Sequence, residues 1–381
     1  MIGIILAGGR GTRMNSSIPK VLHHINGQTM IERIVRQMQL AAFDKIFIIV
    51  NPDNKDAIDA NLSSCESISL IVQEEPKGTG HAIMCFFKHI DKNDLCSQSL
   101  LVCNGDTPLL RHSLFTQMAS LYPFGLCAFA KDDPTGYGRV IVGEDHLLTI
   151  VEEKDCNRQQ KLVRLCNAGI YLFPFDALEK VIPFLVANNQ QREFYLTDAI
   201  RLLQDRENLK CNILTLDPHD AFMVEGINSP KELASIDSIF HLEFAPLRRD
   251  HLSSIPSLLS RLSHCPYDAT VFLERFKSIE NDPAIKIYTA YHPMVGLIAM
   301  GSLYILRKFA HSASSVGQIE DVVVHRHLDN EGIGTKLITL LIRVARESGC
   351  YKVVLTSAEG NFLFYQKLGF CQHHTQFEIR F

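Results

Sequence analysis

Several features that define whole classes of protein are missing from this sequence of 381 residues. No apolar run approaches the roughly 20 residues that a membrane-spanning helix needs, and the apolar stretch 2–7 lacks the basic lead of a signal peptide. None of the 11 cysteines forms a Cys-x-x-Cys pair, and most lie inside apolar runs, which predicts buried free thiols in a reducing cytoplasm. The net charge of −4 argues against a general surface for nucleic acid or membranes. These absences leave a globular, cytoplasmic protein.

The sequence does contain the pattern of an α/β protein in two blocks. From residue 2 to about 239, short apolar runs alternate with helical patterns, as in βα units. Strands are predicted at 2–7, 45–51, 69–73, 99–103, 125–131 and 169–173. A helix is predicted to start near Thr29, because Thr29 and Glu32 have the spacing of a capping box. The pattern restarts near residue 243 with the strand-like segment FAPL, so we place two domains at 1–240 and 241–381.

A glycine-rich segment, LAGGRGTRMNSSIPKVLH, follows the first predicted strand directly. Gly8, Gly9 and Gly11 allow the backbone to approach an anion and to present N–H donors. Arg13 and Lys20 add two cations close to the same turn. Donors for phosphate oxygens, together with charge that stabilises a departing pyrophosphate, suit a triphosphate substrate.

The first block resembles the uridyltransferase domain of bacterial N-acetylglucosamine-1-phosphate uridyltransferases over essentially all of residues 1–240. The matching segments recur in order: LAGGRGTRM, PKVLH, VQEEPKGTGHA, NGDTPLL, DDPTGYGRV, IVEEKD, NAGIYLF, EFYLTDAI and VEGIN. The resemblance implies a Rossmann-like nucleotidyltransferase domain with a mixed, mostly parallel sheet. It also implies UTP and N-acetylglucosamine 1-phosphate as substrates and Mg²⁺ as cofactor.

The same resemblance assigns roles to individual residues. Those expected to hold the nucleotide are Leu6, Ala7, Gly8, Gly9, Lys20, Gln73, Gly78, Thr79, Asn104 and Gly105. Those expected to hold the sugar are Gly138, Glu152 and Asn167. Gln73 would read uracil, because a primary amide can both donate to and accept from a pyrimidine edge. Asp106 and Asn228 would bind Mg²⁺, a hard cation that takes few protein oxygens beside phosphate. Arg13 and Lys20 would be catalytic, since they would stabilise the developing charge.

The second block carries a different signature. The segment GQIEDVVVHRHLDNEGIGTKLITLLIRVARESGCYKVVLTSAEGNFLFYQKLGF reads as a strand, a Gly-x-Gly turn, an amphipathic helix, a strand and a helix ending in Gly-Phe. Residues 244–381 resemble the GNAT acetyltransferases, and closely the glucosamine 6-phosphate N-acetyltransferases. A GNAT acyltransferase domain would stand where bacterial uridyltransferases usually carry a left-handed β-helix, of which the sequence shows no hexapeptide repeat. The chain would then be a bifunctional enzyme of UDP-N-acetylglucosamine biosynthesis.

The GNAT resemblance also implies a set of site residues. Those expected at the sugar phosphate are Ser263, Lys308, His311, Glu320, Asp321, Tyr351, Lys352 and Arg380. Those expected at acetyl-CoA are Val322, Val323, Val324, Asn330, Gly332, Gly334 and Thr335. Glu320, the catalytic carboxylate, and Asp321 would orient the amine or the water that deprotonates it. Tyr365 would protonate the departing thiolate of coenzyme A. Arg380, in the terminal strand, implies a homodimer through this domain in which it completes the neighbouring sugar-phosphate site.

The turn that should receive the coenzyme pyrophosphate departs from the family pattern. Asp329 and Asn330 stand where Arg or Gln followed by Gly is usual, and Glu331 comes next. Two unit charges about 5 Å apart in water repel by roughly 0.8 kcal/mol, so the two carboxylates together are expected to weaken coenzyme binding about tenfold. Asn330 tolerates the left-handed conformation that the glycine of the family pattern would adopt. We therefore expect an impaired but working loop.

Three alternatives stay open at the level of sequence. The second domain could be a non-catalytic unit that senses a sugar phosphate or forms the dimer. The first domain could transfer a nucleotide to another sugar. The acetyltransferase could take the 6-phosphate of glucosamine, which the resemblance favours, or the 1-phosphate.

Overall fold

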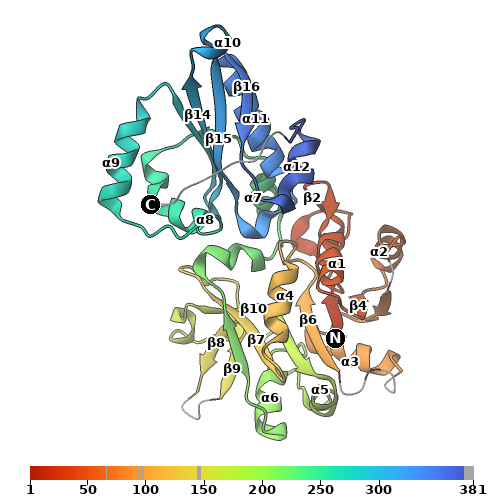
Figure 1. Cartoon of the computed structure of the whole chain (residues 1–381). Helices are drawn as coiled ribbons and strands as arrows, with labels where there is room; N and C mark the ends of the chain where they lie inside the picture. The colour runs from red at the N-terminus through yellow and green to blue at the C-terminus, as the bar shows by residue number, and fades with distance from the viewer. Residues whose placement is uncertain (66, 92–94, 96–97, 144–146, 373–381) are drawn as a thin grey trace. The chain divides into compact units, whose positions relative to one another are not determined.

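The computed structural model describes residues 1–65, 67–91, 95, 98–143 and 147–372 (Figure 1). The chain divides into two compact units, Met1–Asp237 and Ser238–Phe381. Within the described residues, no helix is long and apolar enough to cross a membrane. The strands form a nine-stranded sheet and a short two-stranded sheet in the first unit, and a five-stranded sheet in the second.

The first unit alternates strands and helices along the chain. Its strands are β1 (Ile2–Leu6), β2 (His24–Ile25), β3 (Gln28–Thr29), β4 (Lys45–Val50), β5 (Ile68–Val72), β6 (Ser99–Asn104), β7 (Gly125–Ala130), β8 (Arg139–Val142), β9 (Leu148–Val151), β10 (Leu165–Pro174) and β11 (Asn212–Thr215). Its α-helices are α1 (Met30–Leu40), α2 (Lys55–Asn61), α3 (Thr79–His89), α4 (His112–Ala119), α5 (Phe175–Val181), α6 (Asp198–Glu207) and α7 (Pro230–Asp237).

The large sheet has the order β11-β7-β10-β6-β1-β4-β5, with β8 paired to β10 and β9. The strands β6, β1, β4 and β5 run parallel to one another, whereas β10 is antiparallel to β6 and β7. This confirms the mixed, mostly parallel sheet. The strand order reverses direction between β1 and β6, and ligands of such sheets bind outside the carboxyl ends of the strands at that point.

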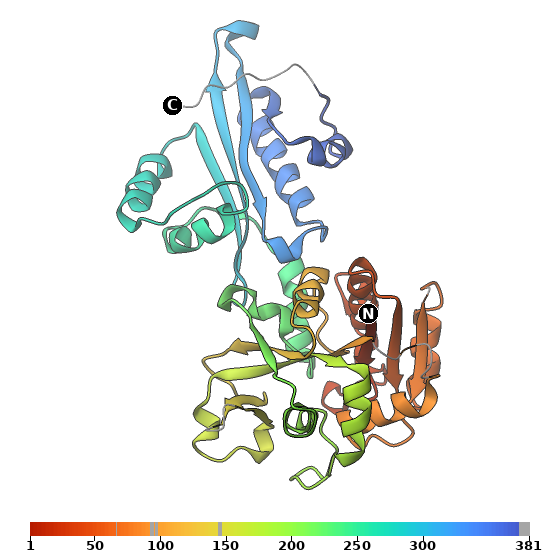
Figure 2. The same cartoon turned by 60° about the horizontal axis from the view of Figure 1, so that its bottom comes forward.

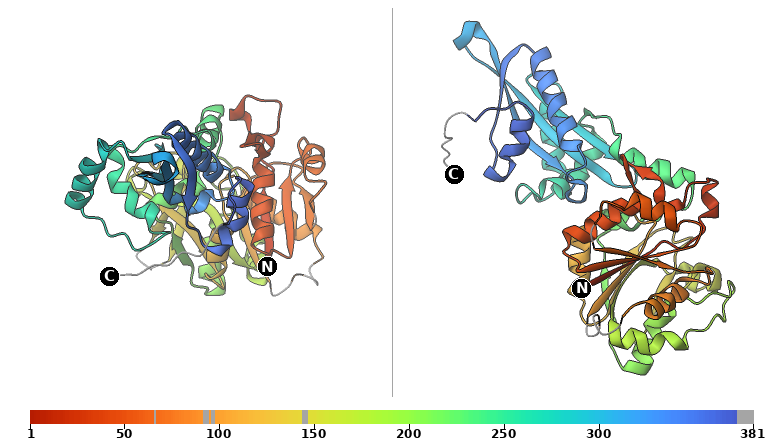
Figure 3. Two further views of the ribbon diagram at one scale, coloured as in Figure 1. Left: turned by 45° about the horizontal axis from the view of Figure 1, so that its top comes forward. Right: turned by 90° about the vertical axis from the view of Figure 1, so that its right-hand side faces the viewer.

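Different helices cover the two faces of this sheet (Figures 2 and 3). Ile2 and Ile4 of β1 belong to a buried cluster that includes side chains of α3, α5 and α6. On the opposite face, a Cβ at Gly3 would lie 2.7 Å from Met38 Sδ of α1. The glycine therefore allows α1 to pack closely against the central strand.

Helix α1 begins as the sequence predicts. The Thr29 hydroxyl accepts a hydrogen bond from the Glu32 N–H at 3.2 Å, and the Glu32 carboxylate accepts from the Thr29 N–H at 2.7 Å. The predicted strands are all present, with ends that differ by one residue in most cases. The exception is β10, which starts four residues before the predicted 169–173 because the strand continues through an irregularity between Asn167 and Tyr171.

The second unit is built around its five-stranded sheet. Its strands are β12 (Ala245–Pro246), β13 (Ile285–His292), β14 (Gly296–Arg307), β15 (Ser315–Val324) and β16 (Cys350–Leu355), in that spatial order. Its α-helices are α8 (Ile255–Leu259), α9 (Ala269–Glu280), α10 (Ala310–Ala313), α11 (Ile333–Glu347) and α12 (Phe362–Lys367). Only the pair β15 and β16 is parallel. The described strands of this unit thus form an open sheet, and this part of the chain contains no β-helix.

Helix α11 lies against β14 and β15 on the face away from α8 (Figure 1). A Cβ at Gly301 would lie 3.0 Å from the Leu341 side chain, and one at Gly317 would lie 3.0 Å from Ala345. Glycines on both strands therefore let the helix approach the sheet. The opposite face is covered by a cluster that includes Leu258 and Phe276.

Candidate active sites

The first candidate site forms where β1 and β6 end side by side. Leu6 and Asn104 are register partners, and the Gly105 N–H donates to the Leu6 carbonyl at 2.9 Å. A Cβ at Gly105 would lie 3.0 Å from that same carbonyl oxygen, so the close approach requires glycine. The glycine-rich turn after β1 and Asp106 after β6 are consequently held together at the point where strand order reverses.

The charged residues predicted for catalysis and metal binding converge at this point. The Lys20 Nζ donates to Asp106 Oδ2 at 2.5 Å and to Asn228 Oδ1 at 2.8 Å. Arg13 Nη2 donates to the same Asn228 oxygen at 2.8 Å. The Ile227 N–H donates to the Asp106 carbonyl at 2.9 Å, which brings Asn228 beside Asp106 across more than a hundred residues of chain. Four residues from separate motifs therefore share one small space.

This arrangement fits the oxygen set expected for Mg²⁺. One cationic nitrogen, that of Lys20, already bonds to both Asp106 and Asn228, so the two oxygens are close enough to bind one cation. A carboxylate and an amide carbonyl are hard oxygen ligands, as Mg²⁺ prefers. The role of the pair as metal ligands stays a prediction.

The predicted uracil pocket lies on the other side of the turn. Gln73 is buried, and its Nε2 donates to the Gly78 carbonyl at 3.0 Å. A Cβ at Gly8 would lie 2.7 Å from Gln73 Oε1, so Gly8 leaves room for the amide where alanine would displace it. Gly78 has the left-handed φ of 101° and precedes α3, whose first residue Thr79 accepts from the Leu196 N–H at 3.0 Å. The hydroxyl of Thr79 thus holds the protein's own backbone.

Two buried asparagines that sequence reasoning missed support the turn. Asn51 Nδ2 donates to the Gly8 carbonyl at 3.0 Å, and Asn54 Nδ2 donates to the Ala7 carbonyl at 2.8 Å. Each also accepts the other's backbone N–H at 2.9 Å, which fixes both side chains. Because the carbonyls of the turn are bonded, its conformation is held with no ligand present. The signal in the sequence was the Asn-Pro-Asp-Asn segment directly after a buried strand.

The residues predicted for the sugar also come together. The Asn167 N–H donates to the Gly138 carbonyl at 2.9 Å, and a Cβ at Gly138 would lie 3.3 Å from Glu152 Oε2. Burial raises the pKa of Glu152, while a hydrogen bond from the Thr197 hydroxyl at 3.1 Å partly opposes that shift. A Cβ at Gly169 would overlap Asn104 Nδ2, so the Asn104 amide has room only because this residue, with its left-handed φ of 69°, is glycine.

Asp198, the first residue of α6, has a raised pKa that can be tested through the pH dependence of stability. Burial, followed by the charge of Asp155, raises the pKa of Asp198 from 3.8 to about 6. A raised carboxyl pKa stabilises the fold at low pH, and this contribution is lost as the pH rises through about 6. We expect the melting temperature of Asp198→Asn, minus that of the wild type, to increase between pH 4 and pH 7.5. The matched variant Asp205→Asn removes a more exposed carboxylate of α6 and should show no such increase in thermal melts; an equal increase would contradict the assignment.

The second candidate site surrounds an irregularity in β15. The register between β14 and β15 shifts between the pairs Met300–Val323 and Ser302–Glu320, and Asp321 has a left-handed φ of 52°. Burial, followed by the charge of Glu320, raises the pKa of Asp321. Gln318 Nε2 donates to Glu320 Oε1 at 2.5 Å. The two carboxylates predicted at the amine are therefore held at the bulge, and Val322 to Val324 follow it directly.

The turn after β15, here called the coenzyme loop (residues 325–334), has the backbone shape expected of it. Asn330 adopts a left-handed φ of 63°, as its residue type allows, and Gly332 is the left-handed N-cap of α11 with a φ of 82°. Gly334 lies close to Phe364 and Val324, while Thr335 is exposed in the first turn of α11. The N-terminal N–H groups of this 15-residue helix start at the loop, which suits an anion.

Asp329 has a charged partner that the sequence did not indicate. Its two carboxylate oxygens each accept a hydrogen bond from the guanidinium of Arg261, at 2.9 Å and 2.9 Å. Arg261 follows α8, far away in the sequence, and no motif of the loop could reveal the pair. The negative charge of Asp329 is therefore largely neutralised by Arg261.

The predicted sugar-phosphate residues are only partly gathered. The rings of His311 and Tyr351 lie 4.6 Å apart, and Lys352 Nζ lies 5.6 Å from the Tyr351 ring. Ser263 and Lys308 are exposed and are not joined to this group by any described contact. Arg380 lies outside the described residues.

Tyr365 lies in α12, between the rings of Phe364 and Phe370 at centroid distances of 5.0 Å and 5.8 Å. Burial raises the pKa of its phenol, so the group stays protonated at neutral pH. A protonated phenol is the state that a proton donor requires.

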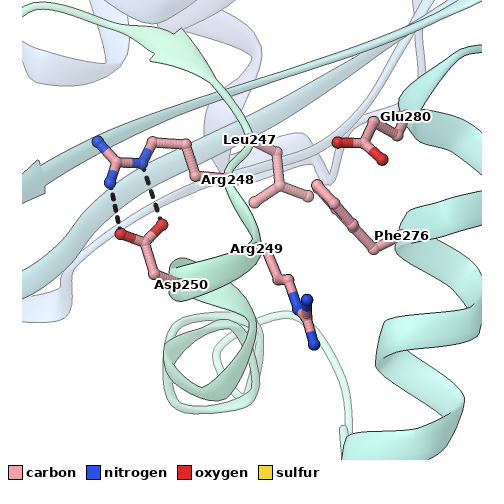
Figure 4. Close-up of a pocket in the computed structure, with 6 residues that line it drawn as sticks. All are labelled: Leu247, Arg248, Arg249, Asp250, Phe276 and Glu280. Atoms are coloured by element: carbon pink, nitrogen blue, oxygen red, sulfur yellow. Dashed lines mark hydrogen bonds and ion pairs between the residues drawn. The ribbon is translucent and has the colours of Figure 1, made fainter.

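A depression of about 610 Å³ lies elsewhere on the second unit (Figure 4). It is lined by residues of the segment between β12 and α8 and by residues of α9, namely Leu247, Arg248, Arg249, Asp250, Phe276 and Glu280. None of these is among the predicted site residues, and β12 is at the opposite edge of the sheet from β16.

Comparison with known proteins finds a matching family for each of the two units. The family model of the MobA-like NTP transferase domain matches residues 3–166, and that of the GNAT acetyltransferase family matches residues 251–370. A protein of Acanthamoeba polyphaga mimivirus, a probable UDP-N-acetylglucosamine pyrophosphorylase, is 33% identical over 248 residues, which are 62% of this chain and 94% of that protein. The chain belongs to this pyrophosphorylase family. Its two matched domains make it a transferase.

Other relatives extend the comparison. The bifunctional protein GlmU of Rippkaea orientalis is 36% identical over 241 residues, which are 62% of this chain and 51% of that protein. The chain thus spans about half the length of such bifunctional relatives. Among solved structures, a Trypanosoma brucei acetyltransferase is 35% identical with a TM-score of 0.35, covering 37% of this chain and 99% of that one. An Arabidopsis thaliana glucosamine-6-phosphate N-acetyltransferase is 26% identical with a TM-score of 0.36, covering 37% and 98%.

Proposed function

We propose that the first unit converts UTP and N-acetylglucosamine 1-phosphate to UDP-N-acetylglucosamine and pyrophosphate. The observation that carries this proposal is the convergence of Lys20, Asp106, Asn228 and Arg13 at the switch point of the sheet. The mimiviral relative, by its name, supports the nucleotide sugar. The fixed turn after β1 would receive the triphosphate, and Gln73 would select uracil.

The chemistry needs positioning and charge more than a covalent intermediate. An oxygen of the sugar phosphate attacks the α-phosphorus of UTP in line, and pyrophosphate leaves. Lys20 and Arg13 would stabilise the leaving group, while Gly138, Glu152 and Asn167 orient the sugar. Asp106 and Asn228 would hold Mg²⁺, which neutralises phosphate charge when bound.

For the second unit, we propose acetyl transfer from acetyl-CoA to the amine of a glucosamine phosphate, with the 6-phosphate favoured. The bulge in β15 holds Glu320 and Asp321 directly before Val322 to Val324, the last residues of the strand, which would pair with the pantetheine arm. His311, Tyr351 and Lys352 would bind the phosphate. A 6-phosphate product would need an enzyme that moves the phosphate to O1 before the first unit could use it.

Assembly and location complete the proposal. The His311–Tyr351 group is exposed, and we propose that Arg380 of a second copy completes it in a homodimer. A cytoplasmic location accords with the free cysteines among the described residues, half of which are buried.

The decisive experiment incubates the purified chain with UTP, acetyl-CoA and each glucosamine phosphate separately. We expect acetylation of the 6-phosphate and uridylation of N-acetylglucosamine 1-phosphate. Use of another sugar 1-phosphate in preference would refute the first part. Calorimetric binding of a glucosamine phosphate without acetylation would favour the alternative, a sensing or dimerising second unit.

A further inference from the structure

An arginine from outside the coenzyme loop bonds to the residue just before the loop and to a residue in its middle. Arg261 Nη1 donates to the carbonyl of Val324, the last residue of β15, and to Asp329 Oδ1. Its Nη2 donates to Asp329 Oδ2 at 2.9 Å, so the guanidinium and the carboxylate form a two-bond fork. Such a fork fixes orientation as well as distance.

Val324 and Asp329, the two residues that Arg261 joins, have different roles in the proposed acetyl-CoA site. Val324 ends the strand expected to pair with the pantetheine arm. Asp329 starts the turn in which Asn330 and Gly332 are both left-handed and lead into the N-terminus of α11. The guanidinium therefore lies between the expected pantetheine strand and the expected pyrophosphate turn, where the coenzyme passes from amide to phosphate.

The ion pair between Arg261 and Asp329 also sets the charge of the coenzyme loop. Asp329 is 47% exposed, and without a partner its carboxylate would repel an approaching diphosphate. The side chain of Arg261 is 35% exposed, and an ion pair of this exposure adds little to folding stability by itself. Its consequence should be seen in the affinity for a dianionic ligand, because the pair sets the charge of the loop.

We propose that Arg261 is a positioning residue of the coenzyme site, which neutralises Asp329 and fixes the loop in the shape that receives the pyrophosphate. The inference rests on the proposed acetyltransferase activity. It assigns the loop's cation to the segment after α8, which is distant from the loop in the sequence.

The test compares Arg261→Gln, Asp329→Asn and the double variant in the full chain. We expect Arg261→Gln to raise the Kd of coenzyme A and the KM of acetyl-CoA about tenfold, because Asp329 is left unpaired beside the phosphates. The kcat and the KM of the sugar phosphate should not change. Asp329→Asn alone should bind at least as tightly as the wild type, and the double variant should return to within about threefold of it. Arg261→Lys, which keeps the charge and loses the fork, should fall between wild type and Arg261→Gln.

The chain offers a matched control in Arg248, which forms the same two-bond fork with Asp250 at 3.0 Å and 2.6 Å (Figure 4). Arg248 adjoins β12, three strands from β15 in the sheet, so Arg248→Gln should leave the Kd unchanged. An unchanged thermal melt and an unchanged KM for the sugar phosphate check that the second unit of each variant is folded. Tight coenzyme binding by Arg261→Gln, or failure of Asp329→Asn to restore it, would overturn the inference alone. If Arg261→Gln does not fold, weaker binding by Asp329→Asn than by wild type overturns it. A wild-type chain that binds no coenzyme A overturns the proposed acetyl transfer as well.

Discussion

Asp106→Ala should lose uridyl transfer by a factor on the order of 10³ or more while acetyl transfer stays near the wild-type rate. Asp106 supplies the carboxylate of the oxygen pair that converges on Lys20 Nζ. Without it, Asn228 alone would have to hold Mg²⁺, and Lys20 would lose the partner that fixes its ammonium. Pyrophosphate release and coenzyme A thiol release, measured on the same preparation, report the two reactions separately.

A matched control is Asp132→Ala, which removes a carboxylate that is 96% exposed and paired with Arg164. That variant should keep both activities. Binding of Mn²⁺ in the presence of UTP gives a readout independent of turnover, and it should be lost in Asp106→Ala only. Uridyl transfer that persists in Asp106→Ala and still requires Mg²⁺ would remove Asp106 from the metal site.

The parts of the first unit that the sequence predicts well are those in which residue type and local spacing determine the geometry. The capping box of α1 needs only Thr29 and Glu32, and both bonds are present. The turn after β1 follows a continuous apolar strand, so the sequence already implies that this turn lies at the carboxyl end of a buried strand. The resemblance then brings Asp106 and Asn228 together, which neither spacing nor composition could do, and the Ile227–Asp106 bond is the contact that accomplishes it.

The parts that could not be predicted depend on partners from distant segments. Asn51 and Asn54 look like an ordinary turn, yet their amides bond to the carbonyls of Ala7 and Gly8. Asp329 looks like a defect when only its neighbours are considered. Its meaning changes once Arg261 is placed against it, because the sign of a charge's effect depends on what surrounds it. Such contacts follow from tertiary packing between distant segments, which local sequence does not predict.

Tyr365→Phe should lower the kcat of acetyl transfer by about 10²–10³ and leave uridyl transfer unchanged. The departing coenzyme thiolate needs a proton, and burial raises the pKa of the Tyr365 phenol so that the proton is present at neutral pH. Phenylalanine keeps the ring contacts with Phe364 and Phe370, so the fold of α12 should be maintained. The KM values for acetyl-CoA and for the sugar phosphate should therefore stay within about twofold, which assigns the loss to the chemical step.

Tyr291→Phe provides the control, because Tyr291 of β13 stacks on His251 with its side chain 45% exposed and carries no predicted role. Removing that hydroxyl should change neither reaction. A Tyr365→Phe enzyme with an undiminished kcat would show that another group, or water, protonates the thiolate. Loss of coenzyme binding in the same variant would point to a structural role for the hydroxyl. The split between kcat and KM thus separates proton donation at Tyr365 from packing, just as the Arg261 variants separate charge neutralisation from folding at the coenzyme loop.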